Sequence, residues 1–241
     1  MKYIPIFLFL ICFTGCEITE TITINPDGSG VIDMKQHREE NSYMRLAGEE
    51  YTKENVFKDT TYVFKDYINK YNENFKKYQP EEQQLFQKYA NVKVHTKRSS
   101  FEKEYKTEFE LHFNAVSEIP DLCKTEDYAS DIQHNYSLKA EDHYFRIDYN
   151  FDGKIFNRKV VIINEKELEK AKKQSNEFNS KYGSLKLTQS YILNYHFPGN
   201  IKSVSNSKAL IGLDKKSLTL EFQLAECLRD PESTNLQVTL E

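Results

Sequence analysis

The most regular feature of the sequence is an alternation of apolar and polar residues, which is typical of half-buried β-strands. In the stretch EITETITIN it places Ile18, Ile22 and Ile24 on one face, together with Glu20, and threonines on the other. Similar alternation recurs over residues 31–36, 91–97, 105–113, 145–162, 185–197, 218–224 and 236–240. The clearest turn is Asp152-Gly153, a pair that favours the primed hairpin types. We therefore expect antiparallel strands, several of them joined as hairpins.

Apolar residues at helical spacing mark the regions between these strands. Between residues 60 and 90 aromatic and aliphatic side chains recur every three or four positions, which predicts an amphipathic helix, and Pro80 suits the first turn of a second one. Residues 117–133 predict a short helix with irregular flanks. Asn164 suits the N-cap of a further helix, and Gly183 is expected to end that helix in the left-handed conformation. The aromatic stripes are interpreted as core contacts.

The fold class follows from the order of these elements. No repeat, low-complexity linker or charge block divides the chain, and the 39% hydrophobic content is adequate for a buried core. The sequence predicts an α+β fold, with an antiparallel β-sheet and two or three amphipathic helices packed on it. We expect residues 16–241 to form one soluble domain.

The first residues, MKYIPIFLFLICFTGC, have the features of an export signal. Lys2 precedes an apolar run over residues 4–13, which is too short to span a bilayer. The run ends in Phe13-Thr14-Gly15-Cys16, which resembles the lipobox of bacterial lipoproteins except that Phe13 stands where leucine is usual. The resemblance implies a lipoprotein signal peptide at residues 1–15 and a Cys16 that is acylated, as with palmitate, and becomes the N-terminus. The alternatives are an ordinary signal peptide and an N-terminal membrane helix.

Charge and hydropathy limit the partners. The chain has 33 basic and 37 acidic side chains, a net charge of −4, which does not suit a nucleic acid or an anionic lipid partner. After residue 16 no segment is long and apolar enough to span a membrane. We expect a soluble body in the bacterial cell envelope, attached to a membrane through its N-terminal lipid. The periplasmic or surface face of an outer membrane is favoured, and a protein or small-ligand partner stays unknown.

Four cysteines occur in the chain. Cys12 lies in the predicted signal and Cys16 at the lipobox, which leaves Cys123 and Cys227. In an oxidising compartment these two residues can form a disulfide, although buried thiols are an equal alternative. A catalytic thiol is a weaker hypothesis because neither residue has a recognisable local signature.

No motif identifies a metal, cofactor or catalytic site. None of the six histidines has metal-ligand spacing, although His95 and His112 lie on neighbouring predicted strands, which leaves zinc as a minor hypothesis. The chain has no GxSxG sequence, phosphate-binding loop or dinucleotide fingerprint. Adjacent glutamates such as Glu81 and Glu82 point in different directions in regular structure, so they are interpreted as solvated surface. We therefore predict no catalytic residues, no metal and no cofactor.

The stretch NPDGSGVIDMKQ partly matches a calcium-binding loop of the EF-hand type. Asn25, Asp27 and Ser29 occupy liganding positions 1, 3 and 5. Position 12, however, is the neutral Gln36, and β-branched residues rather than a helix precede the loop. We expect a hairpin turn instead.

Several motifs together resemble an uncharacterised family of predicted bacterial lipoproteins. They are the lipobox cysteine, TITINPDGSGVIDM, TTYVFKDYINKY, PEEQQLFQKYANVKVH and FPGNIKSVSNSKALIGLDKKSLTLEF. The resemblance covers most of the chain and implies an envelope location and a single domain. It implies no activity, substrate or catalytic residue.

Three functional hypotheses remain at the level of sequence. The first is a non-enzymatic envelope lipoprotein with a binding or structural role, whose sharper version binds a lipid or another small apolar ligand. The second is an enzyme that processes envelope glycans or peptides with carboxylates from distant segments. The third is a purely structural, surface-exposed protein.

Overall fold

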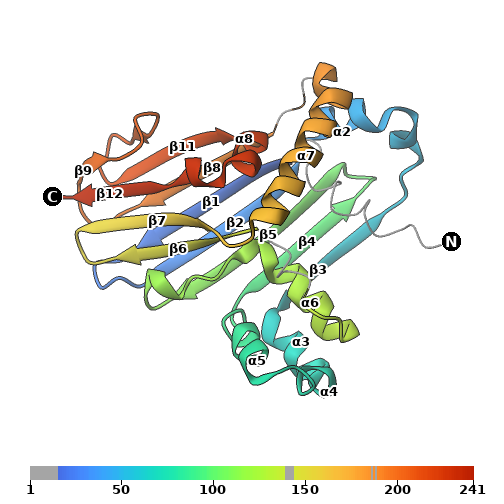
Figure 1. Ribbon diagram of the computed structural model, residues 1–241, viewed down its shortest axis with the longest axis horizontal. Coiled ribbons are helices and arrows are strands. Elements are labelled where there is room, and N and C mark those ends of the chain that lie inside the picture. Colours follow the sequence, from blue (N-terminus) through green and yellow to red (C-terminus); the bar gives the residue numbers. More distant parts are fainter. Residues whose placement is uncertain (1–15, 139–143, 186, 188) are drawn as a thin grey trace.

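A computed structural model describes residues 16–138, 144–185, 187 and 189–241. The predicted signal peptide, residues 1–15, lies outside the described residues. The body contains an eight-stranded sheet, a four-stranded sheet and several helices, which confirms the α+β class (Figure 1).

The eight-stranded sheet has the order β10-β11-β8-β1-β2-β5-β4-β3. Its strands are β1 (Cys16–Ile24), β2 (Gly30–Arg38), β3 (Phe57–Val63), β4 (Lys93–Ser99), β5 (Glu104–Phe113), β8 (Ser190–His196), β10 (Leu210–Ile211) and β11 (Ser217–Gln223). The expected antiparallel pairing holds for every pair in this sheet except one, since β1 and β8 run parallel. The first strand of the body thus lies inside the sheet, next to a strand from near the end of the chain.

The four-stranded sheet covers one face of the larger sheet. Its order is β6 (Phe145–Phe151), β7 (Ile155–Ile162), β12 (Leu236–Leu240) and β9 (Ile201–Val204), all antiparallel. The β6–β7 hairpin is confirmed, with Gly153 at φ 93° in its turn. The rings of Phe156 and Tyr195, one from each sheet, lie 5.3 Å apart between centroids. The covered side of the large sheet is called the inner face below, and the opposite side the outer face.

Helices surround the edges of the two sheets (Figure 1). They are α2 (Glu40–Ala47), α3 (Phe64–Lys70), α4 (Asn72–Phe75), α5 (Pro80–Gln87), α6 (Thr125–His134), α7 (Glu165–Tyr182) and α8 (Leu224–Arg229). The 3-10 turns are η1 (Gly48–Lys53), η2 (Val116–Glu118), η3 (Leu122–Lys124), η5 (Gly183–Leu185) and η6 (Pro231–Thr234). Pro80 is the first residue of α5, as predicted.

The predicted helix over the start of the 60–90 region is wrong in its first part. Residues 57–63 form β3, and helix begins only at Phe64, whose backbone N–H donates to the carbonyl of Val92. The threonines and Tyr62 of this segment favour a strand, and pairing with β4 stabilises the strand over the helix. The core interpretation of the aromatic stripe is confirmed, because Phe64, Tyr78 and Phe86 are buried.

Both ends of α7 test the capping predictions. The Asn164 side chain accepts a hydrogen bond of 3.2 Å from the backbone N–H of Glu167, which confirms the N-cap. The left-handed conformation expected at Gly183 is wrong, since this residue has φ −59° and continues into η5. The chain tightens into a 3-10 turn there, which bonds the last carbonyls without a positive φ.

A buried polar cluster joins the two sheets. Glu20 on β1 accepts hydrogen bonds from the hydroxyls of Tyr149, Tyr191 and Tyr195. Arg158 on β7 donates to the Tyr191 hydroxyl at 2.8 Å, and its Nε lies 3.6 Å from Glu20 Oε1. Glu20 and Arg158 are 0% and 2% exposed. This set of five residues is called the Glu20 cluster below.

Candidate functional site

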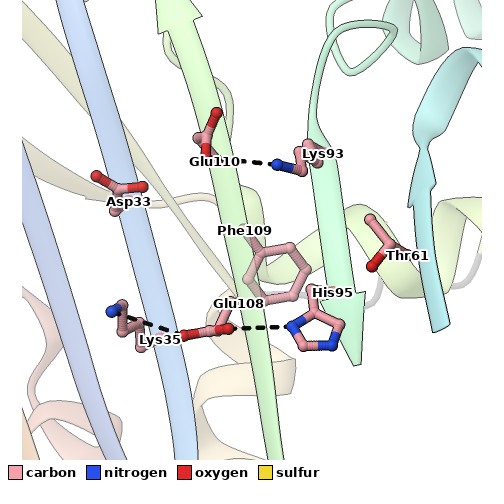
Figure 2. Close-up of a pocket in the computed structure, with 8 residues that line it drawn as sticks. All are labelled: Asp33, Lys35, Thr61, Lys93, His95, Glu108, Phe109 and Glu110. Carbon is pink, nitrogen blue, oxygen red and sulfur yellow. Dashed lines mark hydrogen bonds and ion pairs between the residues drawn. The ribbon is translucent and has the colours of Figure 1, made fainter. Parts of the chain in front are cut away.

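The outer face of the large sheet carries charged residues at paired positions on β2, β5 and β4. The register places Asp33 opposite Glu110, Lys35 opposite Glu108, and Glu108 opposite His95 on its other side. These positions alternate with buried apolar residues, so the sequence pattern that builds the core also directs these side chains outward. They surround a cavity of about 280 Å³ (Figure 2). Its lining residues are Asp33, Lys35, Thr61, Lys93, His95, Glu108, Phe109 and Glu110.

Asp33 differs from the other acidic residues of this cavity because its carboxylate has no compensating contact. It makes no hydrogen bond or ion pair with another residue in the described ranges. Partial burial, followed by the charge of Glu110, raises the pKa of Asp33 above its ordinary value. Lys35 and His112 act in the opposite sense but do not cancel this effect. A group placed against Asp33 that carries positive charge or N–H donors would relieve that cost.

The other charges of the cavity are paired. His95 Nε2 lies 2.9 Å from Asp59 Oδ1, and its Nδ1 lies 3.2 Å from Glu108 Oε2. Hydrogen bonding to Asp59 and then to Glu108 raises the pKa of His95. The Lys35 ammonium lies 3.6 Å from Glu108, and the Lys93 ammonium is 3.9 Å from Glu110 (Figure 2). The cavity therefore holds one uncompensated carboxylate within a frame of ion pairs.

The histidine pair considered for zinc is not assembled. His95 faces Glu108 across the β4–β5 ladder, whereas His112 is opposite Val31 on β2. Within the described part of the chain, no group of three or more histidine, cysteine or acidic side chains has the arrangement of a metal site.

A second cavity of about 200 Å³ continues the first along the outer face. It shares Lys35 and Glu108 with the first and is also lined by Glu17, Thr19, Gln36, His37 and Lys106. Together the two cavities extend from β3 to the beginning of β1. Both are lined mainly by charged and polar residues, so the polar surface is continuous with the end of the sheet at which Cys16 lies.

Cys16 is the first residue of β1 and pairs with Arg38 of β2. Strand β1 therefore starts at the predicted lipidation residue itself. Among the described residues, no helix is long and apolar enough to cross a bilayer.

The disulfide between Cys123 and Cys227 that the sequence left open is not formed in the structure, where both residues are thiols. The Cys123 sulfur lies 3.5 Å from the Met34 sulfur and 3.8 Å from Gln36 Nε2, beneath β2. Cys227 on α8 is buried, and that burial raises the pKa of its thiol to about 12. A thiol with this pKa stays protonated at neutral pH, which makes it a poor nucleophile.

The NPDGSG stretch forms the β1–β2 hairpin, as predicted. Gly28 has φ 84°, and its N–H donates to the Asn25 carbonyl at 3.0 Å. The Asp27 carboxylate accepts from the backbone N–H and the hydroxyl of Ser29, which lowers the pKa of Asp27. The carboxylate of Asp27 thus forms its hydrogen bonds within the turn itself.

Sequence reasoning did not single out Asp33, Glu108 or Glu110. The only indication in the sequence was a charged residue at an outward position in each of two strands in which apolar and polar residues alternate. Such residues are common on wet sheet faces, and only the register of β2 on β5 shows that Asp33 and Glu110 lie opposite each other.

Comparisons with known proteins add little about the site. No family model matches this chain, and no curated protein matches it. A solved structure that resembles it is the folded domain of LppM from Mycobacterium tuberculosis, determined by NMR. The two chains are 9% identical, the match covers 95% of this chain and 91% of the other, and the TM-score is 0.43. A likeness this weak assigns neither an activity nor a site.

Proposed function

We propose that this protein is a lipid-anchored protein of the bacterial cell envelope, attached through acylated Cys16, that binds a cationic partner on the outer face of its large sheet. The observation that carries the proposal is that Cys16 both ends the predicted lipobox and starts β1. Cleavage before Cys16 would remove no described element of the fold. It would leave an acylated N-terminus directly at one end of the sheet.

The binding part of the proposal is supported by Asp33. Its carboxylate lies in a cavity, its pKa is raised, and no described side chain forms a hydrogen bond or an ion pair with it. An ammonium or guanidinium group, from a polyamine or from a basic peptide, is the chemical complement of such a carboxylate. Charged and polar residues line most of the two outer-face cavities, which favours a charged ligand over a wholly apolar one, although the aliphatic parts of those side chains form much of the wall of the second cavity.

The anchor is tested by Cys16→Ser in the bacterium that makes the protein, with Cys12→Ser as the matched control four residues away. Cells are fed an alkyne-bearing fatty acid and then fractionated. We expect Cys16→Ser to lose the fatty-acid label and to leave the membrane fraction, since several acyl chains supply the attachment. Cys12→Ser is expected to keep both. A Cys16→Ser protein that stays fully in the membrane fraction would overturn the proposal.

A second candidate function is hydrolysis of envelope glycans or peptides. It is favoured by one observation, the raised pKa of Asp33 directly opposite a second acid, Glu110. A carboxyl group that keeps its proton to a higher pH is suited to general-acid catalysis. Purified protein is incubated with peptidoglycan fragments, and Asp33→Asn is compared with wild type. If wild-type protein releases no soluble product, this candidate is removed.

A further inference from the structure

Three apolar side chains are exposed together at one corner of the large sheet. Val56, Phe57 and Phe101 are 42%, 67% and 73% exposed. Val56 and Ser100 exchange backbone and side-chain hydrogen bonds of 2.9 to 3.1 Å, which holds the start of β3 against the β4–β5 turn. Phe101 follows Ser100 in that turn, and Phe57 pairs with Ser99. These three residues are called the apolar corner below.

The strand register places the apolar corner at the same end of the sheet as Cys16. The steps across the sheet are Cys16 opposite Arg38, His37 opposite Lys106, Tyr105 opposite Arg98, and Ser99 opposite Phe57. Four strand spacings of about 4.8 Å separate β1 from β3, so the anchor and the corner lie roughly 19 Å apart along one edge. Figure 1 shows this end of the sheet beside α2, with the C-terminus at the opposite end.

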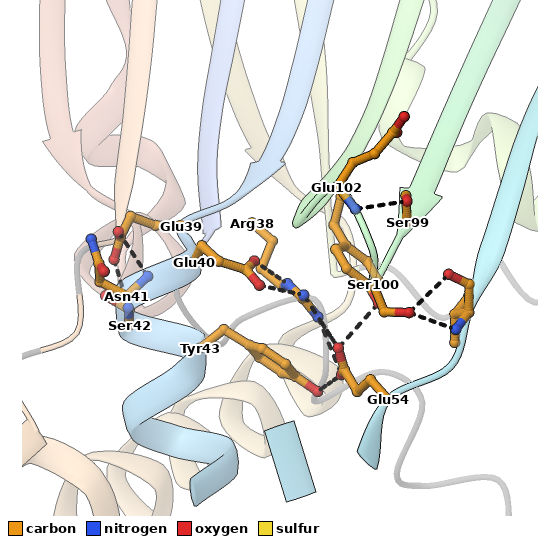
Figure 3. A network of polar contacts seen from close by, with 12 residues as sticks. Arg38, Glu39, Glu40, Asn41, Ser42, Tyr43, Glu54, Ser99, Ser100 and Glu102 are labelled. Atoms are coloured by element: carbon orange, nitrogen blue, oxygen red, sulfur yellow. Dashed lines mark hydrogen bonds and ion pairs between the residues drawn. The ribbon is translucent and has the colours of Figure 1, made fainter. Parts of the chain in front are cut away.

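A polar network around Arg38 includes Glu54, which lies two residues before Val56. The Arg38 guanidinium lies 3.8 Å from the ring centroid of Tyr43 and 3.3 Å from that of Tyr105. It also bonds Glu40 at 3.0 Å, and both tyrosine hydroxyls donate to Glu54 (Figure 3). This network fixes the ends of β2 and β5 without using the apolar corner. The exposed side chains therefore do not serve the core.

Although the chain as a whole is acidic, the unpaired charges nearest the corner are basic, because the acidic neighbours Glu102 and Glu54 are paired with Lys97 and Arg38. Lys58 follows Phe57 and therefore points to the other face of β3, and Lys103 lies two residues after Phe101. Both lysines are exposed, and neither forms an ion pair with another described residue. Lys103 instead lies over the ring of Tyr51, 4.2 Å from its centroid. Apolar and aromatic side chains flanked by lysines are the composition that binds the interface of an anionic bilayer.

We propose that the apolar corner is a second contact with the membrane, in which Phe57, Phe101 and Val56 enter the interface of the bilayer that holds acylated Cys16. This inference rests on the proposed lipid anchor. Lys103, and Lys58 from the other face of β3, approach the phosphate groups of anionic lipids. Two contacts on one edge fix the orientation of the sheet, so that the end with the β10–β11 hairpin points away from the membrane.

The absence of tryptophan from the chain permits a direct test. Phe57→Trp and Phe101→Trp each introduce a single fluorophore into the full-length lipidated protein, which is reconstituted into vesicles of phosphatidylethanolamine and phosphatidylglycerol. Leu213→Trp is the matched control, because Leu213 is 105% exposed and lies in the β10–β11 turn at the opposite end. Brominated lipids quench only a tryptophan that reaches the bilayer.

We expect at least a twofold loss of fluorescence for Phe57→Trp and Phe101→Trp in brominated vesicles, with an emission shift to shorter wavelength. Leu213→Trp is expected to change little. If acylated protein floats with the vesicles but all three variants are unquenched, the inference is wrong and the anchor stands. Equal quenching of all three also overturns it. If mass spectrometry shows no acyl group on Cys16, both the anchor and the inference fail.

Discussion

The carboxylate of Glu20 and the guanidinium Nε of Arg158 lie 3.6 Å apart between the two sheets, and both side chains are almost fully buried. One residue comes from the first strand of the body and the other from β7, so their contact joins segments that are far apart in the sequence. Three tyrosine hydroxyls complete the hydrogen bonding of the carboxylate. The pair therefore fixes how the small sheet lies on the large one.

Glu20→Gln is expected to destabilise the protein by about 3–5 kcal/mol, because it leaves the buried Arg158 charge without its counter-ion. The measurement is urea unfolding of the chain from residue 16 onward. Glu17→Gln is the matched control on the same strand, since Glu17 is only partly buried, and its effect is expected within about 0.5 kcal/mol. Similar losses for the two variants would contradict this account of the Glu20 cluster.

The same cluster predicts a loss of stability at alkaline pH. Burial and then the charge of Glu20 raise the pKa of Tyr149 well above 10, and burial is also the main cause for Tyr191 and Tyr195. The folded state therefore retains protons that the unfolded state releases above about pH 10. Stability is fully present below that pH and falls above it by about 1.4 kcal/mol per pH unit for each tyrosine.

Tyr149→Phe removes one of these retained protons and is expected to reduce the alkaline slope by about 1.4 kcal/mol per pH unit. This is only part of the slope, because burial also raises the pKa of Tyr78, Tyr144 and Cys227. Urea midpoints measured between pH 9 and pH 11.5 give the slope. Tyr136→Phe is a suitable control because Tyr136 is 44% exposed. An unchanged slope in Tyr149→Phe would show that other groups control alkaline unfolding.

Gly30→Ala tests the tight start of β2. An added Cβ would lie 2.0 Å from the Thr23 carbonyl oxygen and 2.7 Å from Phe113 Cζ. Backbone must move to relieve the first contact, so we expect a loss of at least about 2 kcal/mol in urea unfolding. Gly183→Ala is the comparison, since its Cβ would meet nothing within 4 Å and its φ is helical. That substitution is expected to stabilise by roughly 0.4–1 kcal/mol.

Asp33→Asn separates binding from stability. Since the folded state raises the pKa of Asp33, its charge costs stability once the pH rises above that pKa, and the neutral amide removes the cost. We expect a stability gain of up to about 0.5 kcal/mol at pH 7, together with at least a tenfold loss of affinity for spermidine. Stability is measured by urea unfolding, and affinity by calorimetry. The salt concentration is kept low, at about 20 mM, so that ions screen the charges little.

Asp148→Asn is the control for this experiment, because Asp148 is exposed and paired with Arg146 on β6. It is expected to leave spermidine binding unchanged. Wild-type protein that does not bind spermidine or a lysine-rich peptide would remove the cationic-partner proposal while leaving the anchor untouched.

Local patterns predicted most of the fold. Strands such as β1, β5 and β11 were predictable because their alternation is complete within a few residues and decides which face is buried. The β1–β2 and β6–β7 turns were predictable because Asp-Gly pairs have few favourable conformations. Residues 57–63 were not, since their apolar residues follow no regular spacing and only pairing with β4 shows that the segment is a strand.

The polar sites depend on distant partners and were therefore beyond local patterns. Glu20 was placed on the apolar face of its strand, yet nothing near it in the sequence indicates Arg158 or the three tyrosines. Asp33 likewise acquires its environment from β5, about 75 residues away in the register that joins the strands.

The parallel pairing of β1 with β8 also bears on the order of folding. For a chain exported N-terminus first, β1 emerges at the start, but its neighbour on one side, residues 190–196, emerges near the end. Pairing between strands so distant in sequence has a large loop-closure entropy cost, so the β1–β8 pair forms late in folding. The large sheet therefore cannot be completed until residues 190–196 are available to pair with β1, which makes its completion a late step of folding.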